Sequence, residues 1–280
     1  MRRAAQATSV RIAESGRNAS GVLINRSSTT DGASQWLDLF AATVRDRVLE
    51  PSEREALENA FRGIRGYARN EIVGSDRKRV QLHLVVRGWA ARFQMLEDGS
   101  QQITDFILPG EFCDLSILAG RPSEEVVALT PLRTALLDKA PMLTAIEQHP
   151  SLCLALLRIA FNDQAILRQS LVSLGCREKR EHLAHLLCEL NFRLRRAGMV
   201  FDHEFDLPLT QDQLGDALGM SAVHTNRILQ RLRKEHILSF DHRHMVIHQL
   251  DSLADIADFD DSYLDQGGGT HLHVTTGRKF

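Results

Sequence analysis

Four cationic side chains gather in the last third of the chain, at Arg227, Arg231, Arg233 and Lys234. Between Ser221 and Glu235 a single acid accompanies them, so this segment carries a local charge of +3 in a chain whose net charge is −2. Guanidinium groups bind phosphates, and they also bond the O6 and N7 atoms of guanine in pairs. Because the place of positive charge matters more than the total, a near-neutral chain can still bind a polyanion such as DNA.

Two short predicted helices would position these side chains. Thr210 is a favourable N-cap for a helix over Gln211–Leu218, and Gly219 can adopt the left-handed conformation that ends it. Ser221 can cap a second helix, whose residues at helical spacing are predicted to face inward: Val223, Ile228, Leu229 and Leu232. Two helices joined by a glycine turn are typical of the helix-turn-helix, whose second helix enters the DNA major groove. The alternative is an ordinary helical hairpin with a charged, solvated face.

A predicted β-hairpin follows the second helix directly. The segments Ile237–Phe240 and Met245–His248 are rich in β-forming residues, and Asp241–His244 separates them as a turn. A hairpin at this place favours a winged helix-turn-helix over a plain helical hairpin. The run TQDQLGDALGMSAVHTNRILQRLRKEHILSF, from Thr210 to Phe240, resembles the C-terminal DNA-binding domain of the Crp/Fnr family of bacterial transcription regulators.

The resemblance implies which residues contact DNA. In relatives, residues near the start of the second helix meet base edges, and the matching positions here are Ala222, Val223, Asn226 and Arg227. Arg227 has the fork that bonds guanine, whereas Ala222 and Val223 offer only apolar contact, so the preferred half-site should differ from that of the best-known member. His224 is placed to reach a base or a phosphate. The remaining candidates would contact phosphates, which position the protein without specifying sequence: Thr210, Gln211, Ser221, Arg231 and Arg243.

Further upstream, between residues 67 and 138, the pattern changes to short β-rich segments. They lie at 72–73, 81–86, 90–96, 103–108, 126–129 and 134–137, with turn residues such as Asp98-Gly99 between them. Strands and turns at this spacing predict a β-sandwich or jelly roll. The run VVRGWAARFQMLEDGSQQITDFILPGEF, from Val85 to Phe112, resembles the cyclic-nucleotide-binding β-roll of the same family. The expected fold is therefore α+β, with a jelly-roll-like N-terminal sensor domain, a long dimerisation helix and a C-terminal winged helix-turn-helix.

The loop that would hold an effector departs from the family pattern. Nucleotide-binding members follow the Pro-Gly-Glu-Phe start, here at 109–112, with a Gly-Glu pair for the ribose and later an Arg-Ser or Arg-Thr pair for the phosphate. This chain has Asp114-Leu115 and Glu124-Glu125 near those places. Carboxylates facing a phosphate would repel it, so we expect a degenerate pocket that binds neither cyclic AMP nor cyclic GMP. Its residues would be Gly110, Glu111, Asp114, Leu115, Glu124 and Glu125.

Neither a cofactor nor a metal is expected. The four cysteines, at 113, 153, 176 and 188, lie too far apart in the sequence for an iron–sulfur cluster or a zinc site. His83 or Cys113 could serve a haem, and Cys113 or Cys153 could sense oxidation, but a lone histidine on a strand is more often packed or solvated. His271 and His273, near the C-terminus, make a weak case for a metal.

A long helix is predicted between the two domains, over Leu143–Leu174, with Pro150 opening its main segment. Leu152, Leu156, Ile159 and Ile166 give it an apolar face that can contact the β-roll. Further residues in steps of four and three form a seam of the kind that a two-stranded coiled coil needs: Cys153, Leu157, Ala160, Gln164, Leu167, Leu171 and Leu174. A helix buried within one subunit is the alternative, but the resemblance implies the dimer helix here, so we expect a homodimer.

The chain is expected to divide into a disordered basic extension (1–34), the β-roll domain (35–141), the dimerisation helix (142–174), the winged helix-turn-helix (175–250) and an acidic, flexible tail (251–280). The extension also resembles a transit peptide in composition. The β-roll domain opens with two helical patterns up to Arg62, the second with Leu57 and Phe61 on its apolar face. No apolar run is long enough for a membrane span, and the scattered thiols indicate a reducing cytoplasm.

We therefore expect a homodimeric, sequence-specific transcription regulator that binds double-stranded DNA at an inverted repeat. It would act as an activator or a repressor, with RNA polymerase as a candidate partner. The alternative is a sensor whose β-roll binds an effector and whose helical domain contacts a protein partner. The sequence contains none of the motifs of serine hydrolases, phosphate-binding loops or zinc proteases, so an enzyme is not expected.

Overall fold

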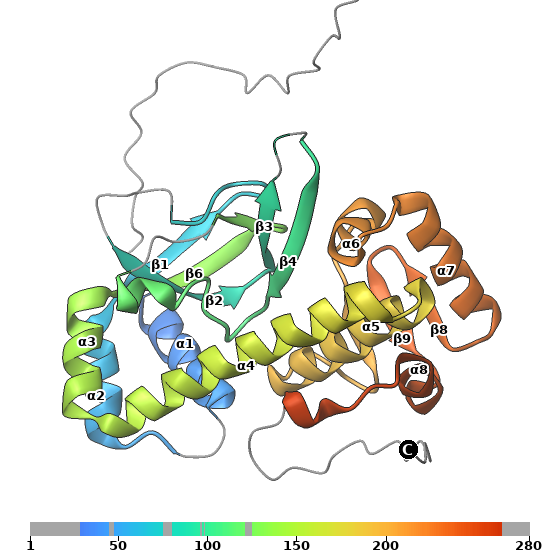
Figure 1. Cartoon of the computed structure of the whole chain (residues 1–280). Coiled ribbons are helices and arrows are strands. Elements are labelled where there is room, and N and C mark those ends of the chain that lie inside the picture. The colour runs from blue at the N-terminus through green and yellow to red at the C-terminus, as the bar shows by residue number, and fades with distance from the viewer. Residues whose placement is uncertain are drawn as a thin grey trace, which may run out of the picture.

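The computed structural model describes residues 29–44, 48–74, 80–95, 97, 99–120 and 125–264. A β-rich domain comes first, and a small helical domain with its own sheet comes last. The long helix α4 (Pro150–Cys176) crosses the molecule between them (Figure 1). This arrangement confirms the α+β architecture that the sequence predicts.

Two three-stranded antiparallel sheets form the β-roll. In spatial order their strands are β1 (Phe61–Tyr67), β6 (Leu132–Asp138) and β2 (Gln81–Arg87) in one sheet, and β4 (Gln101–Ile107), β3 (Ala90–Met95) and β5 (Val126–Ala128) in the other. Apolar side chains from both sheets are buried together, among them Val85, Ala90, Ile107, Val126 and Leu132. Of the six β-rich segments predicted in this region, five are strands, whereas at 72–73 only Ile72 forms an isolated bridge, to Val127. Strands β3 and β4 pair as the hairpin that the turn residues Asp98-Gly99 predict.

Strand β1 corrects one prediction. The sequence pattern places Phe61 on the apolar face of a helix, whereas α2 (Pro51–Ala60) ends one residue earlier and Phe61 opens β1. Phe61 has extended backbone angles and pairs with Leu137 of β6. The strand sequence FRGIRGY holds two glycines and two arginines in place of alternating apolar residues, so hydrophobic periodicity does not reveal it.

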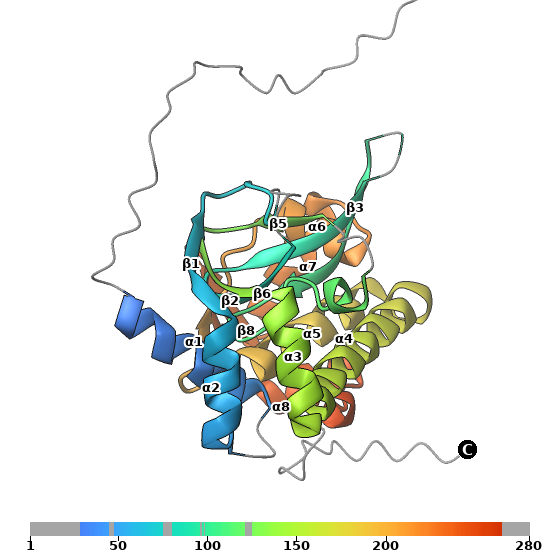
Figure 2. The same cartoon turned by 90° about the vertical axis from the view of Figure 1, so that its left-hand side faces the viewer.

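Helices α1 (Thr29–Thr43), α2 and α3 (Lys139–Gln148) cover one end of the β-roll (Figure 2). Trp36, Leu37 and Phe40 of α1 are almost completely buried. Residues 29–34 are helical, which corrects the prediction of a disordered extension up to residue 34. Extending a helix costs far less than starting one, so the packed turn at Trp36–Phe40 supports the turns before it. The rest of the predicted extension, 1–28, lies outside the described residues.

Helix α4 presents one face to the interior of its own chain. Leu152, Leu156 and Ile159 are buried in the core shared with α1, α2 and the first sheet. Ile166, two turns further, is buried in the core shared with β3, β4 and the C-terminal domain. The prediction that these four residues contact the body of the protein is confirmed.

The C-terminal domain packs helices against a small sheet. Its elements are α5 (Lys179–Arg196), β7 (Glu204–Asp206), α6 (Gln211–Leu218), α7 (Ala222–Lys234), β8 (Leu238–Asp241) and β9 (His244–Ile247), and the sheet order is β7-β9-β8. Leu183, Leu187, Leu190, Leu214 and Leu232 are completely buried between them. The predicted winged helix-turn-helix is therefore the observed topology.

The segment after residue 250 corrects the prediction of a flexible tail. Helix α8 (Leu250–Ala257) packs against α5, and the short 3-10 helix η3 (Asp261–Tyr263) follows it. Leu253, Ala254, Ala257, Phe259 and Leu264 are buried there. Aspartates fill the outward positions, so the acidic composition hides an apolar stripe with helical spacing. The remainder of the predicted tail, 265–280, lies outside the described residues. Within the described part of the chain, no helix has both the length and the apolar character to cross a bilayer.

Candidate nucleic-acid interface

The turn between α6 and α7 is built by specific local bonds. Thr210 Oγ1 accepts from the Gln213 backbone N–H at 3.1 Å, and Gln213 Oε1 accepts from the Thr210 N–H at 2.9 Å. Gly219 ends α6 at φ 59°, the left-handed conformation predicted for it. Gly215, which the sequence argument did not single out, lets the two helices approach. A Cβ there would lie 2.5 Å from the carbonyl oxygen of Met220.

The buried face of helix α7 differs from the predicted face at one residue. Ile228, Leu229 and Leu232 are buried as expected, but Val223 is 72% exposed and Thr225 is completely buried. Thr225 lies three and four residues before Ile228 and Leu229, whereas Val223 lies on the opposite side of the helix. The hydroxyl of Thr225 donates to the Ser221 carbonyl at 3.1 Å, which satisfies the polar atom in the core.

The outward face of α7 forms one stripe. Val223, Arg227, Gln230 and Lys234 are exposed and follow one another in steps of four and three. We call these four residues the α7 stripe. Gln230 and Lys234 were missed as site residues, although the helical spacing from Arg227 could have identified them. A stripe of this kind can enter a groove with one cation at its middle and one at its end.

The other predicted base contacts lie beside the stripe. His224 is exposed, whereas Ala222 and Asn226 are half-buried. The Oδ1 atom of Asn226 is buried without a hydrogen-bond partner among the described residues. Asn226 therefore lies at the edge of the α7 stripe, and its Oδ1 acceptor is buried and unbonded within the described residues.

The predicted phosphate contacts lie at helix starts and at the wing. Ser221 is exposed and caps α7, accepting from the His224 N–H at 3.3 Å, while Thr210 and Gln211 are half-buried at the start of α6. Arg243 is exposed at the β8–β9 turn, where His242 and Arg243 both have positive φ. Such a two-residue turn lets the wing project.

Arg231 is exposed but internally paired. Its Nε lies 3.0 Å from Glu235 Oε1, and Glu235 also pairs with Arg180 of α5. Part of the positive charge counted in the sequence is thus neutralised within the protein. Arg227, by contrast, has no ion pair within the described residues.

The degenerate effector loop uses its carboxylates to hold itself together. Glu111 accepts from the Leu108 N–H at 2.8 Å, and Asp114, which is buried, accepts from the Ser116 N–H at 2.7 Å. Gly110 (φ 91°) lies close to Thr43 of α1, and the Thr43 hydroxyl donates to the Gly110 carbonyl at 2.8 Å. Leu115 packs on the N-terminal core, Glu125 is exposed, and Glu124 lies outside the described residues.

The candidate sensing residues of the β-roll are packed into its core. Burial raises the pKa of the Cys113 thiol to about 12, so the reactive thiolate is disfavoured. Burial also lowers the pKa of His83 to about 4, and its Nδ1 lies 3.2 Å from both Tyr67 Oη and Thr134 Oγ1. No group of three or more potential metal ligands occurs in the described residues.

A charged cluster joins the three parts of the chain, and we call it the Arg193 junction. Arg193 of α5 is buried and bonds Glu111 at 2.7 and 3.0 Å, Glu189 at 3.0 Å and the Phe106 carbonyl at 2.5 Å. Asp105 of β4 lies 3.5 Å from the same guanidinium. Burial raises the pKa of Asp105 and of Glu189, while these acids keep Arg193 charged.

Helix α4 contributes one more acid to the Arg193 junction. Burial, together with the nearby charges of Asp105 and Glu111, raises the pKa of Asp163 to about 7. Arg193 and Arg92 act in the opposite direction but do not cancel it. Asp163 was not predicted as a site residue, because a single acid in a long helix is usually solvated.

The predicted seam of α4 is largely exposed in the single chain. Leu157, Leu167, Leu171 and Leu174 are 44%, 55%, 70% and 39% exposed. Gln164 is also exposed, while Cys153 and Ala160 are half-buried. Phe161, outside the predicted set, adds to this surface at 56% exposure. An apolar surface of this length on one helix is a typical site of association.

Both domains of the chain match known protein families. Residues 181–256 match the family model described as the Crp-like helix-turn-helix domain, and residues 64–149 match the cyclic nucleotide-binding domain. Similar curated proteins include the transcriptional activator protein FnrL of Cereibacter sphaeroides, 26% identical over 208 residues, which are 70% of this chain and 81% of that protein. The nitrogen fixation regulation protein FixK of Bradyrhizobium diazoefficiens is 24% identical over 194 residues, 69% of this chain and 81% of that protein.

Solved structures share the fold. FixK2 from Bradyrhizobium japonicum superposes with a TM-score of 0.61 at 22% identity, covering 69% of this chain and 96% of that one. A CooA mutant from Carboxydothermus hydrogenoformans gives a TM-score of 0.58 at 14% identity, covering 78% of this chain and 95% of that one. The likeness therefore extends over the β-rich domain, the long helix and the winged domain together.

Proposed function

The chain belongs to the Crp/Fnr family and is a DNA-binding transcription regulator, and we propose that it binds an inverted-repeat site as a homodimer without cyclic AMP. The α7 stripe is the observation that supports this proposal most directly. Arg227 is exposed at its middle, away from the core, and it has no ion pair within the described residues. A side chain in this state can form paired bonds with guanine at no cost in broken internal contacts.

Within this proposal each predicted contact has a role. Arg227, Gln230 and Val223 meet base edges, with Val223 touching a thymine methyl group, and Lys234 meets the backbone at the end of the stripe. His224 and Asn226 border these contacts, and Ala222 lets the start of the helix come close to the bases. The phosphate contacts flank the groove: Thr210, Gln211, Ser221, Arg231 and Arg243.

Dimerisation follows from the exposed seam of α4. In water, leaving Leu167, Leu171 and Phe161 half exposed is unfavourable, and a second copy of the same helix can cover them. A twofold dimer would hold two α7 helices about 34 Å apart, so each would read one half of an inverted repeat. Gln164 in the seam would cost stability but favour one register.

The structure of the β-roll loop supports DNA binding without cyclic AMP. Glu111 and Asp114 are committed to bonds that shape the loop. Two arginines reach the loop from outside, but Arg193 is shared among acids, and Arg92 donates to the Cys113 carbonyl at 2.7 Å and lies 3.4 Å from Asp105. A phosphate entering here would therefore meet carboxylates and cations that are already bonded. RNA polymerase is the proposed further partner, since relatives such as FnrL are named transcriptional activators, and the proposed compartment is the cytoplasm, where bacterial DNA lies. An enzymatic activity is no part of this proposal.

The test is a selection of random duplex DNA by the purified full-length protein, with and without cyclic AMP. Enrichment of one inverted repeat in both conditions is the expected result. Enrichment that depends on cyclic AMP would show that the loop binds nucleotide despite Asp114 and Glu125. Enrichment of a single, non-repeated half-site would contradict the proposed dimer, and no enrichment at all would favour a protein partner for the helical domain.

A further inference from the structure

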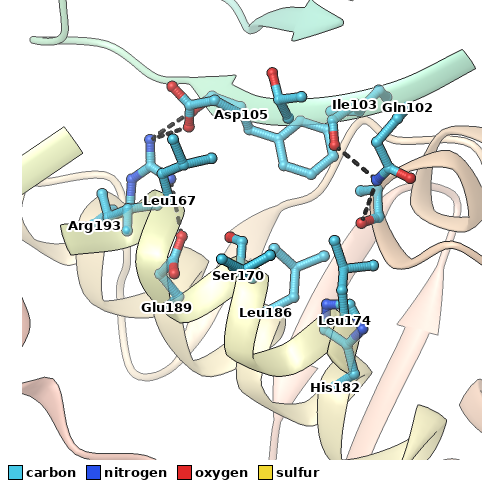
Figure 3. A pocket seen from close by; sticks show the side chains of 15 residues that line it. Gln102, Ile103, Asp105, Leu167, Ser170, Leu174, His182, Leu186, Glu189 and Arg193 are labelled. Atoms are coloured by element: carbon cyan, nitrogen blue, oxygen red, sulfur yellow. Dashed lines mark hydrogen bonds and ion pairs between the residues drawn. The ribbon is translucent and has the colours of Figure 1, made fainter. Parts of the chain in front are cut away.

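A cavity lies where the β-roll, α4 and the winged domain meet; it is open to solvent along the exposed leucines of α4 and offers about 120 Å³ of space. Strand β4 forms its roof, and α4 and α5 form its floor (Figure 3). Ala217 of α6 completes the wall on the side of the helix-turn-helix. None of the effector-loop residues from Gly110 to Leu115 lines this cavity, so it is separate from the loop that the family resemblance implicates.

The walls of the cavity are mainly aliphatic. Side chains from three elements provide them: Ile103 and Phe106 of β4, Ile166, Leu167, Leu171 and Leu174 of α4, and Leu186 of α5. A cavity of about 150 Å³ with walls of this kind holds one benzene ring in another protein. A single six-membered ring is therefore the size of molecule that this cavity accommodates.

The two ends of the cavity differ in chemistry. Arg193, Asp105 and Glu189 lie together at one end (Figure 3), and Arg193 already directs its N–H groups to neighbouring oxygens. An anionic ligand would find no free cation there. His182 lies at the other end, is only 5% exposed, and its Nδ1 has no hydrogen-bond partner within the described part of the chain. This nitrogen has almost no accessible surface, so a ligand in the cavity reaches it only when the imidazole ring turns, and the cost of leaving a buried nitrogen without a partner favours that turn.

We propose that this cavity is an effector site for a small, uncharged ring compound that carries one hydroxyl group, bound with its hydroxyl on His182. Burial and the nearby Lys179 and Arg177 lower the pKa of His182 to about 4, so the imidazole is neutral at pH 7. A hydroxyl can donate to or accept from a neutral imidazole, and it therefore fits either tautomer. The aliphatic walls contact the ring, and Ser170 of α4 lies between the ends.

The position of the cavity gives such a ligand a regulatory effect, and this step rests on the proposed DNA-binding function. Gln102 of β4 donates to the Ala217 carbonyl at 3.0 Å, and Lys179 donates to the Leu218 carbonyl at 3.2 Å. The first bond holds α6 against the β-roll at the rim of the cavity, and the second holds α6 against α5. Leu167, Leu171 and Leu174 belong both to the cavity wall and to the seam of α4. Occupancy would therefore bias how the recognition helices are held in the dimer.

The test uses two probes, benzyl alcohol and toluene, and the full-length protein without DNA. Isothermal titration calorimetry should show that both bind and that benzyl alcohol binds about tenfold more tightly, which is the expected effect of one buried hydrogen bond. His182→Phe keeps a ring at that place but removes the nitrogen, so the two probes should bind it equally. Ser170→Leu should fill the cavity and abolish both, whereas Gln169→Leu, on the same helix but outside the cavity, should retain both.

Failure of either probe to bind the wild-type protein would overturn the site. Equal preference for benzyl alcohol in wild type and His182→Phe would overturn the placement of the hydroxyl. Titration of the selected DNA with and without saturating benzyl alcohol then tests regulation, with a shift of at least threefold expected and an unchanged affinity contradicting it. Probe binding is measured without DNA, so its result does not depend on the DNA-binding function. A protein that selects no DNA would refute the proposed function, and the calorimetry would still show whether the cavity binds the probes.

Discussion

At the scale of single residues, two arginines of α7 carry the same charge in different places. Arg227 lies in the middle of the α7 stripe, and Arg233 is exposed outside it. We expect Arg227→Ala to weaken binding to the selected site by about 1–3 kcal/mol and to relax the preference at one base pair. Fluorescence anisotropy titrations with the selected duplex and its single-base variants measure both quantities.

Arg233→Ala is the matched control for this experiment. It removes an equal charge from the same helix, so it should weaken binding to all duplexes similarly and keep the base preference. If the two variants lose affinity equally and neither changes preference, Arg227 contacts only the backbone.

Asp163 predicts a dependence of stability on pH. Its pKa of about 7 in the folded protein lies above the ordinary value near 3.8, so the protonated form is favoured by folding. That contribution is complete below pH 4 and is lost as the pH rises through 7, where the carboxylate ionises beside Asp105 and Glu111. Between pH 5 and pH 8 the free energy of unfolding should fall by about 2–3 kcal/mol from this group alone.

Asp163→Asn should remove this dependence, because the amide stays neutral. Denaturant titrations at pH 5 and pH 8 measure the difference, with Asp255→Asn on the exposed side of α8 as the control. The variant should be more stable than the wild type at both pH values, and its advantage should be about 2–3 kcal/mol larger at pH 8 than at pH 5, because at pH 5 the carboxyl already ionises in the unfolded chain. A parallel loss of stability in wild type and Asp163→Asn would place the titrating group elsewhere.

At the scale of the elements, the contact between α6 and α7 depends on one missing side chain. A Cβ at Gly215 would meet the Met220 carbonyl at 2.5 Å, a distance that real Cβ atoms do not show. Gly215→Ala should therefore separate the two helices and destabilise the domain by about 1–3 kcal/mol.

Gly175, near the end of α4, is the matched control, because a Cβ built there would have nothing within 4 Å. Gly175→Ala should be neutral or stabilising, by up to about 1 kcal/mol, and thermal unfolding of both variants tests the contrast.

The seam of α4 makes a prediction about assembly. Leu171 is 70% exposed in the single chain, so its replacement by Asp should leave the fold intact and place two like charges across a dimer seam. Leu171→Asp should sediment as a monomer and bind the inverted repeat much more weakly. Val48→Asp, at a side chain 85% exposed before α2 and outside the predicted seam, should stay dimeric. A dimeric Leu171→Asp would mean that another surface holds the copies together.

What the sequence predicts at this scale follows from local rules. The caps at Thr210 and Ser221, the left-handed Gly219 and the existence of strands β2 to β4 depend on neighbouring residues and were found as expected, although burial in these strands does not alternate. Val223 was assigned to the wrong face because a valine outweighed a threonine in a purely apolar count. Strand β1 was missed because its arginines and glycines conceal a strand, and helix α8 was missed because the aspartates in and around it drew attention away from its apolar residues.

At the scale of the whole molecule, the coupling of the three parts could not be predicted. Arg193 bonds Glu111 and the Phe106 carbonyl, which lie 82 and 87 residues away in the sequence. Tyr263, in the segment expected to be flexible, donates to Glu189 at 2.9 Å and so adds the C-terminal helices to the same cluster. No periodicity connects residues so far apart, and composition alone makes Arg193 one of many solvated cations.

The Arg193 junction therefore carries a prediction for the entire chain. Arg193→Met would leave the buried Glu189 and the half-buried Glu111 and Asp105 without their shared cation, and breaking a buried pair such as Arg193–Glu189 costs about 3–5 kcal/mol. Since those acids belong to the β-roll and to α5, the loss should fall on the contact between the two domains. Calorimetry should show one cooperative transition for the wild type and two separated transitions for the variant. Arg195→Met, at an exposed position on the same helix, should keep a single transition. A single, merely shifted transition in Arg193→Met would show that α4 and the apolar core couple the domains without the Arg193 junction.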